Sequence, residues 1–151
     1  MRVGLNTNVL VYAAGLRRSD ADDPKIDTAQ ALIARLRAEA TIVVPVQALG
    51  ELYAVLRRLS WPDTLIRATV YAYDDLIVPE SDRACLHRAL DIAGRHKLQF
   101  WDSMILAACQ QADCSLLLSE DLQDGFQLGS LRVANPFTPA GAAAIDAALA
   151  A

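Results

Sequence analysis

The sequence predicts an α/β protein, a three-layer α/β/α sandwich around a central parallel sheet of four to five strands. Short, continuously apolar segments alternate along the chain with longer segments whose apolar residues recur at helical spacing. Strands that are apolar throughout are typical of a parallel sheet buried on both faces. Right-handed crossover connections then place helices on both of those faces. With 151 residues, the chain has the size of one domain.

Five short apolar segments supply the predicted strands, and most are bounded by a polar residue or a proline. The apolar character is strongest in "TIVVP" and "SLLLS", where it is continuous over several residues. The fifth segment, "LRVANP", is a candidate for a further short strand. The predicted strands lie at residues 3–5, 41–45, 76–79, 115–119 and 131–136.

Helices are predicted between these strands. Asp23 followed by Pro24 indicates a helix start with proline in the first position, after a polar loop at residues 16–25. "SWPD", beginning at Ser60, resembles a capping box, and Ser81 is a candidate N-cap. Beyond a short helix after the first strand, the predicted helices cover residues 26–38, 46–59, 60–74, 81–97 and 102–112, with a further alanine-rich, helix-prone tail at 138–151.

Composition and charge limit the functional classes. The chain is 54% hydrophobic and 21% charged, which predicts a packed core rather than disorder. A net charge of −4 argues against a protein that coats nucleic acid through a broad phosphate footprint. It does not exclude an enzyme that gathers carboxylates in one place and arginines in another.

No sequence feature indicates a membrane or an export signal. No segment approaches the roughly 20 apolar residues that span a bilayer. The apolar N-terminus is followed, rather than preceded, by positive charge at Arg17 and Arg18, unlike a signal peptide. We therefore expect a cytoplasmic protein.

The cysteines and histidines give little indication of chemistry. Cys85, Cys109 and Cys114 are an odd number without zinc-ligand spacing, so we expect them to be small buried residues. His87 and His96 fall on a predicted helix and form no ligand pair.

Polar residues at the ends of buried strands are the main functional signal. Asn6 ends the first strand, and Asp121 follows the fourth. Glu51 lies in the second turn of the helix after the second strand, and Asp102 begins the helix that leads into the fourth. Open parallel sheets bind ligands at the carboxyl ends of their strands. The topology therefore predicts that these four residues meet at one edge of the sheet.

Clustered carboxylates repel one another unless a cation neutralises them. Oxygen ligands at a polar edge suit Mg²⁺ or Mn²⁺, which can polarise a phosphodiester and activate water. Thr7 and Ser119 are candidates to support such a site through hydrogen bonds. Each acid also has an ordinary explanation when it is taken alone. Asp102 could be an N-cap, Glu51 a solvated helix residue, and Asp121 and Asp124 turn residues.

Four segments together resemble the motifs of PIN-domain ribonucleases, and most closely the VapC-type toxins of toxin–antitoxin pairs. They are "VGLNTNVLVYA", "ALGELYAVLRR", "LQFWDSMILAAC" and "LLLSEDLQDG". The resemblance implies a Mg²⁺- or Mn²⁺-dependent endoribonuclease that is silenced by a cognate antitoxin and is usually a homodimer. It implies a PIN-like nuclease domain over residues 1–137, followed by the tail at 138–151.

By position, Glu51, Asp102 and Asp121 match three acidic residues of that family, and Asp124 lies near the fourth motif. The family's first acidic position falls on Asn6, which is nearly isosteric with aspartate but neutral. We therefore expect Asn6, Glu51, Asp102 and Asp121 to form a metal-binding, catalytic set that is weakened by Asn6. The asparagine is either an engineered change that permits expression of a toxic enzyme or a natural impairment.

RNA and antitoxin are the partners that the resemblance implies. Candidate phosphate contacts are Arg57, Arg58, Arg95 and Lys97, although all four also suit solvated helix faces. The apolar stretch at residues 61–76 is either an antitoxin docking surface or ordinary core.

Two other functions remain to be weighed. A haloacid-dehalogenase-type phosphatase needs aspartates where this chain has Asn6 and Asn8. A non-catalytic binding module on the same fold is the second alternative. It is favoured by Asn6 and opposed by the three remaining carboxylates.

Overall fold

The computed structural model describes residues 1–17 and 19–151 and contains a five-stranded sheet in the order β2-β1-β3-β5-β4. Strands β2, β1, β3 and β5 run parallel, and β4 pairs antiparallel with β5. The predicted α/β architecture around a central parallel sheet is confirmed, except that the edge strand β4 is antiparallel. The strands are β1 (Arg2–Leu5), β2 (Thr41–Val43), β3 (Leu116–Leu118), β4 (Gln127–Leu128) and β5 (Leu131–Ala134).

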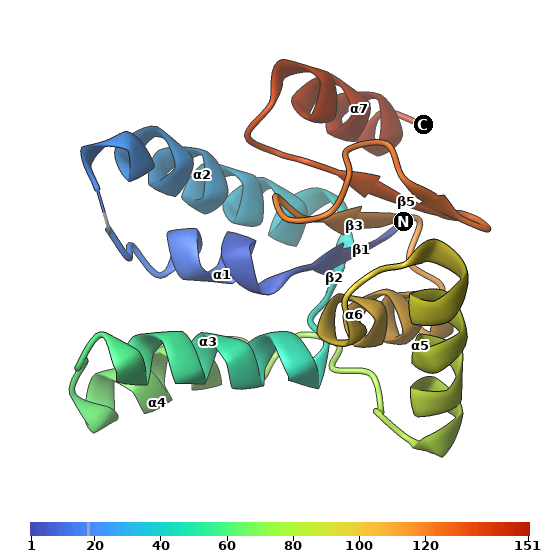
Figure 1. Ribbon diagram of the computed structural model, residues 1–151. Helices are drawn as coiled ribbons and strands as arrows, with labels where there is room; N and C mark the ends of the chain where they lie inside the picture. Colours follow the sequence, from blue (N-terminus) through green and yellow to red (C-terminus); the bar gives the residue numbers. More distant parts are fainter. Residues whose placement is uncertain (18) are drawn as a thin grey trace.

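Helices cover both faces of this sheet, which gives the three predicted layers. In Figure 1, α2 and α7 lie above the sheet, while α5 and α6 lie below it. Helix α3 packs against α1, α4 and α6. The helices are α1 (Thr7–Ala13), α2 (Asp23–Glu39), α3 (Val46–Arg58), α4 (Asp63–Tyr71), α5 (Arg83–His96), α6 (Phe100–Gln111) and α7 (Pro139–Leu149), with a 3-10 turn at Asp20–Asp22.

The first residues of α2, α4 and α5 can be compared with the predicted helix starts. Helix α2 begins at Asp23 with Pro24 in its first turn, as predicted. Helix α5 is capped by Asp82, whose carboxylate accepts from the Cys85 amide, so the cap at Ser81 was predicted one residue too early. The capping box at Ser60 was also wrong. Ser60 has a φ of 59° and ends the turn after α3, and Pro62 precedes the first residue of α4.

Two sheet predictions needed correction. The segment at residues 76–79 forms only a single bridge, Ile77 to Val43, rather than a strand. Strand β4 was not predicted at all, because it has only two residues and its pairing depends on the turn at Gly129, which has a φ of 63°. Both errors lie at an edge of the sheet, where few neighbours impose an alternating or continuous apolar pattern.

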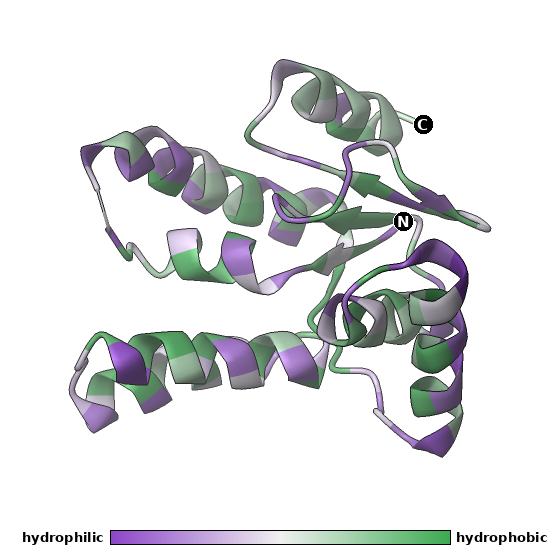
Figure 2. Cartoon of the chain, in the orientation of Figure 1, coloured by the Kyte–Doolittle hydropathy of each residue, from purple (hydrophilic) through white to green (hydrophobic). Residues whose placement is uncertain are grey.

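The core lies between the central strands and α6. Strands β1 and β3 are almost entirely buried, and α6 buries seven consecutive residues from Ser103 to Cys109. Figure 2 shows the matching hydrophobic colour along β3 and α6. Cys85, Cys109 and Cys114 are all buried and free, as expected. Gly4 is required by this packing, since a Cβ there would lie 2.4 Å from Cys109 Sγ.

The alanine-rich C-terminal segment is packed onto the domain. Thr138 caps α7 by accepting from the Gly141 amide, and Ile145 is 2% exposed. A Cβ at Gly141 would lie 1.9 Å from the Asn135 carbonyl oxygen, so the helix approaches the end of β5 closely. Within the described residues, none of the helices combines the length and apolar character needed to cross a membrane.

Candidate active site

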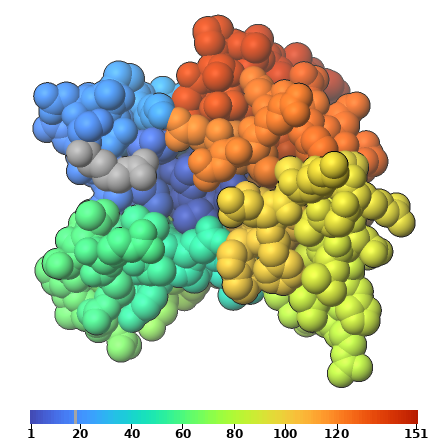
Figure 3. All heavy atoms as spheres, in the orientation of Figure 1, coloured from blue at the N-terminus to red at the C-terminus, as the bar shows by residue number. Residues whose placement is uncertain are grey.

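A cleft of about 420 Å³ opens at the carboxyl edge of the sheet. In Figure 3, the dark-blue N-terminal residues lie in a hollow between the teal α3 and the orange segment that follows β3. The walls combine acidic, cationic and aromatic side chains from four parts of the chain. They are formed by Thr7, Asn8, Val11, Glu51, Ala54, Val55, Arg58, Trp101, Glu120 and Asp121.

Asn6 lies behind this cleft and is 2% exposed. It is the N-cap of α1, and its Oδ1 accepts from the Thr7 amide at 2.6 Å. Its Nδ2 donates to Ser119 Oγ at 2.8 Å. Ser119 Oγ also accepts from the backbone amides of Asp121 and Leu122, at 3.2 and 3.3 Å. The Asn6 amide therefore connects the start of α1 to the loop that carries Asp121.

Glu51 faces the cleft from α3, and its two oxygens are held separately. Thr7 Oγ1 donates to Oε2 at 2.6 Å, and Gln47 Nε2 donates to Oε1 at 2.8 Å. Gln47 is one helical turn before Glu51, which places the two side chains on the same face of α3. Both donors are neutral, so the carboxylate is oriented without its charge being neutralised.

Asp121 is held on the opposite wall by Asn8. Asn8 Nδ2 donates to Asp121 Oδ2 at 2.9 Å, while Asn8 Oδ1 accepts from the Glu120 amide at 3.2 Å. Asn8 thus fixes two consecutive residues of the loop after β3. The neighbouring Glu120 is paired with Lys25 from α2, which also lies 5.3 Å from the centre of the Tyr12 ring.

Asp102 lies in the first turn of α6 and is half-buried. The N-cap of this helix is Gln99, so capping does not explain the aspartate. Burial raises the pKa of the Asp102 carboxyl, and the negative charges of Asp121 and Glu51 raise it further. The three carboxylates predicted to meet at this edge therefore interact electrostatically.

The oxygen donors suit a hard divalent cation, but they are not gathered into a compact cluster. Among residues 1–17 and 19–151, no three His, Cys, Asp or Glu side chains are close enough together to hold a metal ion. Asn6 is neutral, and its side-chain oxygen already accepts from a backbone amide. The donor chemistry fits Mg²⁺ or Mn²⁺, with one negative charge fewer than an aspartate at position 6 would give.

The remaining predicted site residues are distributed unevenly. Arg58 lines the cleft, whereas Arg57, Arg95 and Lys97 are exposed and are not among the residues that line it. Asp124 accepts from the Asn135 amide and from Thr138 Oγ1, each at 3.0 Å, and thereby supports the connection from β5 to α7.

The histidines lie outside the cleft. His87 is exposed, and His96 packs edge-on against Phe126 with ring centres 5.2 Å apart. Neither residue joins the acidic set.

Sequence reasoning missed several contributors to the cleft. Asn8 was considered only as a position where a phosphatase would need an aspartate, and its contact with Asp121 was not expected. Gln47 was signalled by its i,i+4 relation to Glu51. Trp101 precedes Asp102 directly, but its exposure cannot be read from the sequence. The pairing of Lys25 with Glu120 joins residues 95 positions apart, and no local pattern indicates it.

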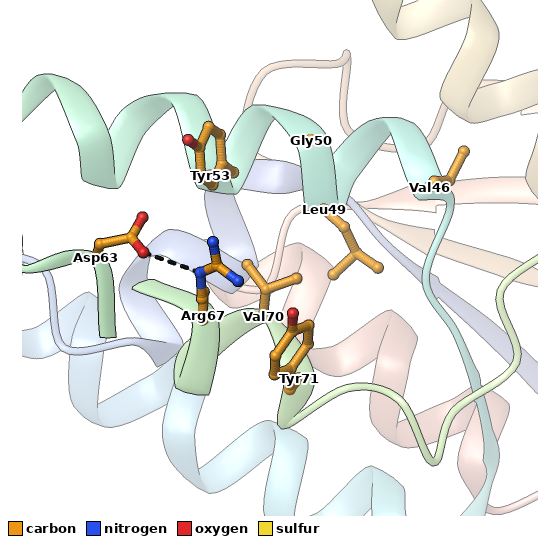
Figure 4. Close-up of a pocket in the computed structure, with 8 residues that line it drawn as sticks. All are labelled: Val46, Leu49, Gly50, Tyr53, Asp63, Arg67, Val70 and Tyr71. Atoms are coloured by element: carbon orange, nitrogen blue, oxygen red, sulfur yellow. Dashed lines mark hydrogen bonds and ion pairs between the residues drawn. The ribbon is translucent and has the colours of Figure 1, made fainter. Parts of the chain in front are cut away.

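A second depression, of about 410 Å³, lies between α3 and α4. Figure 4 shows Leu49 and Val70 at its centre, with Tyr53 and Tyr71 beside them and the Asp63–Arg67 ion pair at one side. Tyr53 is 45% exposed and Tyr71 is 59% exposed. We call this surface the apolar groove. It accounts for part of the stretch at residues 61–76, whose Ile66 is instead fully buried in the core.

Comparison with solved structures finds the same fold in several toxin–antitoxin proteins. A chain from a toxin–antitoxin complex of Klebsiella pneumoniae aligns with 17% identity and a TM-score of 0.65. A chain of VapBC2 from Rickettsia felis, crystallised with a DNA fragment from its promoter, aligns with 16% identity and a TM-score of 0.67. Each alignment covers 89% of this chain and 98% of the other. At such identities, the similarity establishes the fold.

A third structure is VapC20 of Mycobacterium tuberculosis, described as a toxin that cleaves the sarcin–ricin loop. It has 17% identity and a TM-score of 0.58, and the alignment covers 76% of this chain and 86% of VapC20. No curated protein sequence matches the chain. The model of the PIN domain family matches residues 4–126. Since that match spans most of the sequence, this protein belongs to the PIN domain family.

Proposed function

We propose that this protein is the ribonuclease toxin of a toxin–antitoxin pair, a Mg²⁺- or Mn²⁺-dependent endoribonuclease whose activity is weakened by Asn6. One observation carries the proposal. Glu51 and Asp121 line one cleft, and the pKa of Asp102 responds to both of them, although the three residues come from distant parts of the chain. A carboxyl group whose pKa is raised by burial and by neighbouring acids, at the carboxyl edge of a parallel sheet, is suited to a site that holds a cation.

The roles of the residues follow from their contacts. Glu51, Asp102 and Asp121 would hold the cation, with Asn6 in the fourth position. When bound, the cation would neutralise phosphate charge and make a water molecule more acidic. Thr7 and Gln47 orient Glu51, Asn8 orients Asp121, and Ser119 fixes the Asp121 loop. These supporting contacts limit the directions in which the carboxylate oxygens point.

Compared with an aspartate, Asn6 removes one negative charge from the proposed cation-binding residues. It also changes the hydrogen bond to Ser119 Oγ. An aspartate could not donate to Ser119 Oγ, and would instead accept from the serine hydroxyl. Because Ser119 Oγ also receives two backbone amides, this change alters the contact that anchors the Asp121 loop. We expect weak cleavage from the Asn6 protein.

The proposed RNA substrate would meet Arg58 first, since this cation lines the acidic cleft. Arg57, Arg95 and Lys97 would contact phosphates further from the cut, and a homodimer would bring the cationic residues of two subunits along one path. We place this reaction in the cytoplasm.

We further propose that the cognate antitoxin docks in the apolar groove. Exposed tyrosines beside aliphatic residues are typical of protein interfaces, and Tyr53 and Tyr71 meet that description. An arginine of the antitoxin could in addition pair with the carboxylates of the acidic cleft.

A non-catalytic binding module is the second candidate, and a specific observation favours it. Both ends of the Asn6 amide are already satisfied inside the fold, at 2.6 and 2.8 Å. With both hydrogen bonds made inside the fold, Asn6 can have a structural role without taking part in catalysis.

The decisive comparison is between this protein and its Asn6→Asp variant, each incubated with total RNA in Mg²⁺ or Mn²⁺. We expect the variant to cleave RNA about 10–100-fold faster than the unchanged protein, and we expect EDTA to stop this cleavage. Gln123→Glu is the matched control, because it adds the same charge at an exposed residue of the loop after β3 that does not line the cleft. If neither Asn6→Asp nor the unchanged protein cuts broad RNA pools, the binding module is the better account.

A further inference from the structure

Trp101 is an exposed aromatic side chain beside the acidic cleft. It is 56% exposed, yet it lies in the first turn of α6, immediately before Asp102. The same cleft contains Glu51 and Asp121. Leaving so much apolar surface in water forgoes part of the free energy that its burial would give.

The Trp101 ring is supported on one side by Phe100. Phe100 packs against the core and meets the Trp101 ring at 4.8 Å between centres, with the ring planes 65° apart. Within the described residues, Phe100 is the only aromatic ring recorded against Trp101. The indole is therefore supported by the protein while more than half of its surface stays available.

A cation lies in the same cleft. Arg58 is seven residues after Glu51, two turns along one face of α3, or about 10 Å by helix geometry. Arg58 forms no ion pair within the part of the chain that the structure describes. The cleft thus offers an aromatic surface, an unpaired guanidinium and a set of carboxylates.

We infer that Trp101 is a stacking platform for an unpaired nucleobase next to the cleaved phosphodiester, with Arg58 holding a neighbouring phosphate. This inference rests on the proposed function and narrows its substrate to single-stranded RNA or to bases in loops. Aromatic side chains stack on unpaired bases, whereas the bases of a duplex are already stacked on one another. A double helix could not present a base face to Trp101 without unpairing.

Fluorescence tests the inference without requiring cleavage. In a Trp61→Phe background, Trp101 is the sole tryptophan. Short oligouridylate is titrated in Mg²⁺ at low salt, and gels confirm that the RNA stays intact. We expect saturable quenching by the single strand, and much less quenching by its duplex with oligoadenylate. Equal quenching by both would overturn the inference.

Affinity measurements on variants with Trp61 retained complete the test. Trp101→Leu should weaken binding of the single strand by about 5- to 150-fold, and Trp101→Phe should restore most of it. Leu90→Ala is the control, because it truncates an exposed apolar side chain on α5 that lies outside both the cleft and the apolar groove. Unchanged affinity in Trp101→Leu would overturn the inference. So would a change in oligomeric mass without a change in RNA affinity, which would assign the ring to a protein interface.

The two proposals fail in distinguishable ways. If Asn6→Asp cleaves RNA but Trp101→Leu binds it normally, the nuclease stands and the stacking platform is wrong. If no variant cleaves but oligouridylate still quenches Trp101, the nucleotide-binding surface stands without the nuclease.

Discussion

Helix α3 has two solvent-facing sides of opposite chemistry. Glu51, Val55 and Arg58 face the acidic cleft, while Val46, Leu49 and Tyr53 face the apolar groove. At about 100° per residue, the two stripes lie on roughly opposite sides of the helix, and the buried residues Ala48, Leu52 and Leu56 lie between them.

The difference lies in how each surface is organised. In the cleft, polar side chains are fixed by hydrogen bonds across the fold, such as Thr7 to Glu51 and Asn8 to Asp121. In the groove, the Asp63–Arg67 pair is exposed and joins neighbouring turns of one helix, an arrangement that contributes little stability. A fixed polar network is suited to chemistry, and an open apolar surface to a partner. The following predictions test that division.

The largest effect is expected at Glu51. In the Asn6→Asp background, Glu51→Gln should lower RNA cleavage by at least about 100-fold, because it removes a carboxylate proposed to hold the cation. Asp63→Asn, at the edge of the groove, should leave cleavage unchanged. If the two variants lose the same RNA-cleaving activity, the assignment of catalysis to the acidic cleft and of partner binding to the apolar groove is wrong.

The next largest effect is expected in the groove. Tyr71→Asp should weaken antitoxin binding by about 30-fold, equivalent to about 2 kcal/mol, since it places a charge on a docking surface. Pull-down and titration with the polypeptide encoded beside this gene would measure the change. RNA cleavage in the Asn6→Asp background should be unaffected. Leu90→Asp, at another exposed apolar residue, is the control and should bind normally.

A smaller effect is expected at Thr7, whose hydroxyl donates to Glu51 at 2.6 Å. Thr7→Val keeps the shape of the side chain but removes this donor, so cleavage by the Asn6→Asp protein should fall about 10-fold. Thr7→Ser should retain most of the activity. Full activity in Thr7→Val would mean that Gln47 alone orients the carboxylate.

The smallest expected effect is a change in the melting temperature of the protein when Asp102 is replaced. Its folded-state pKa is raised, so the folded protein binds this proton more tightly than the unfolded chain does. Ionisation at neutral pH therefore costs stability, and the cost disappears as the pH falls below the unfolded value of about 3.9. Asp102→Asn should melt about 1–3 °C higher at pH 7.

That stability difference should vanish at acidic pH, and Asp63→Asn should show no gain at pH 7. Differential scanning calorimetry measures both variants under matched conditions. A lower melting temperature for Asp102→Asn at pH 7 would show that the carboxylate stabilises the fold, which would contradict the expected cost of ionising it beside Asp121 and Glu51.

The sequence predicted the parallel core because β3 and, after the exposed Arg2, β1 consist of buried residues without a polar side chain. It also indicated the edge of the sheet at which Glu51 and Asp121 line one cleft, since the ends of parallel strands share an edge. It could not predict β4, which depends on one turn, or the reduction of residues 76–79 to a bridge. Nor could it show that Asp124 supports Asn135 and Thr138, because those contacts depend on how the loops fold back.

The supporting contacts of the cleft were also beyond the sequence. Asn6 to Ser119 and Lys25 to Glu120 join residues about a hundred positions apart. Exposure was equally unpredictable, since Trp101 and the adjacent Phe100 are both aromatic, yet only Trp101 is exposed at the cleft.

Metal binding tests the central claim most directly, because it needs neither a substrate nor an antitoxin. Isothermal titration with Mn²⁺ would compare this protein, Asn6→Asp, and Asn6→Asp combined with Glu51→Gln. We expect Asn6→Asp to bind one Mn²⁺ ion, the unchanged protein to bind it at least about 10-fold more weakly, and the double variant not to bind it. Equal Mn²⁺ affinity in all three proteins would show that the acidic cleft is not a metal site.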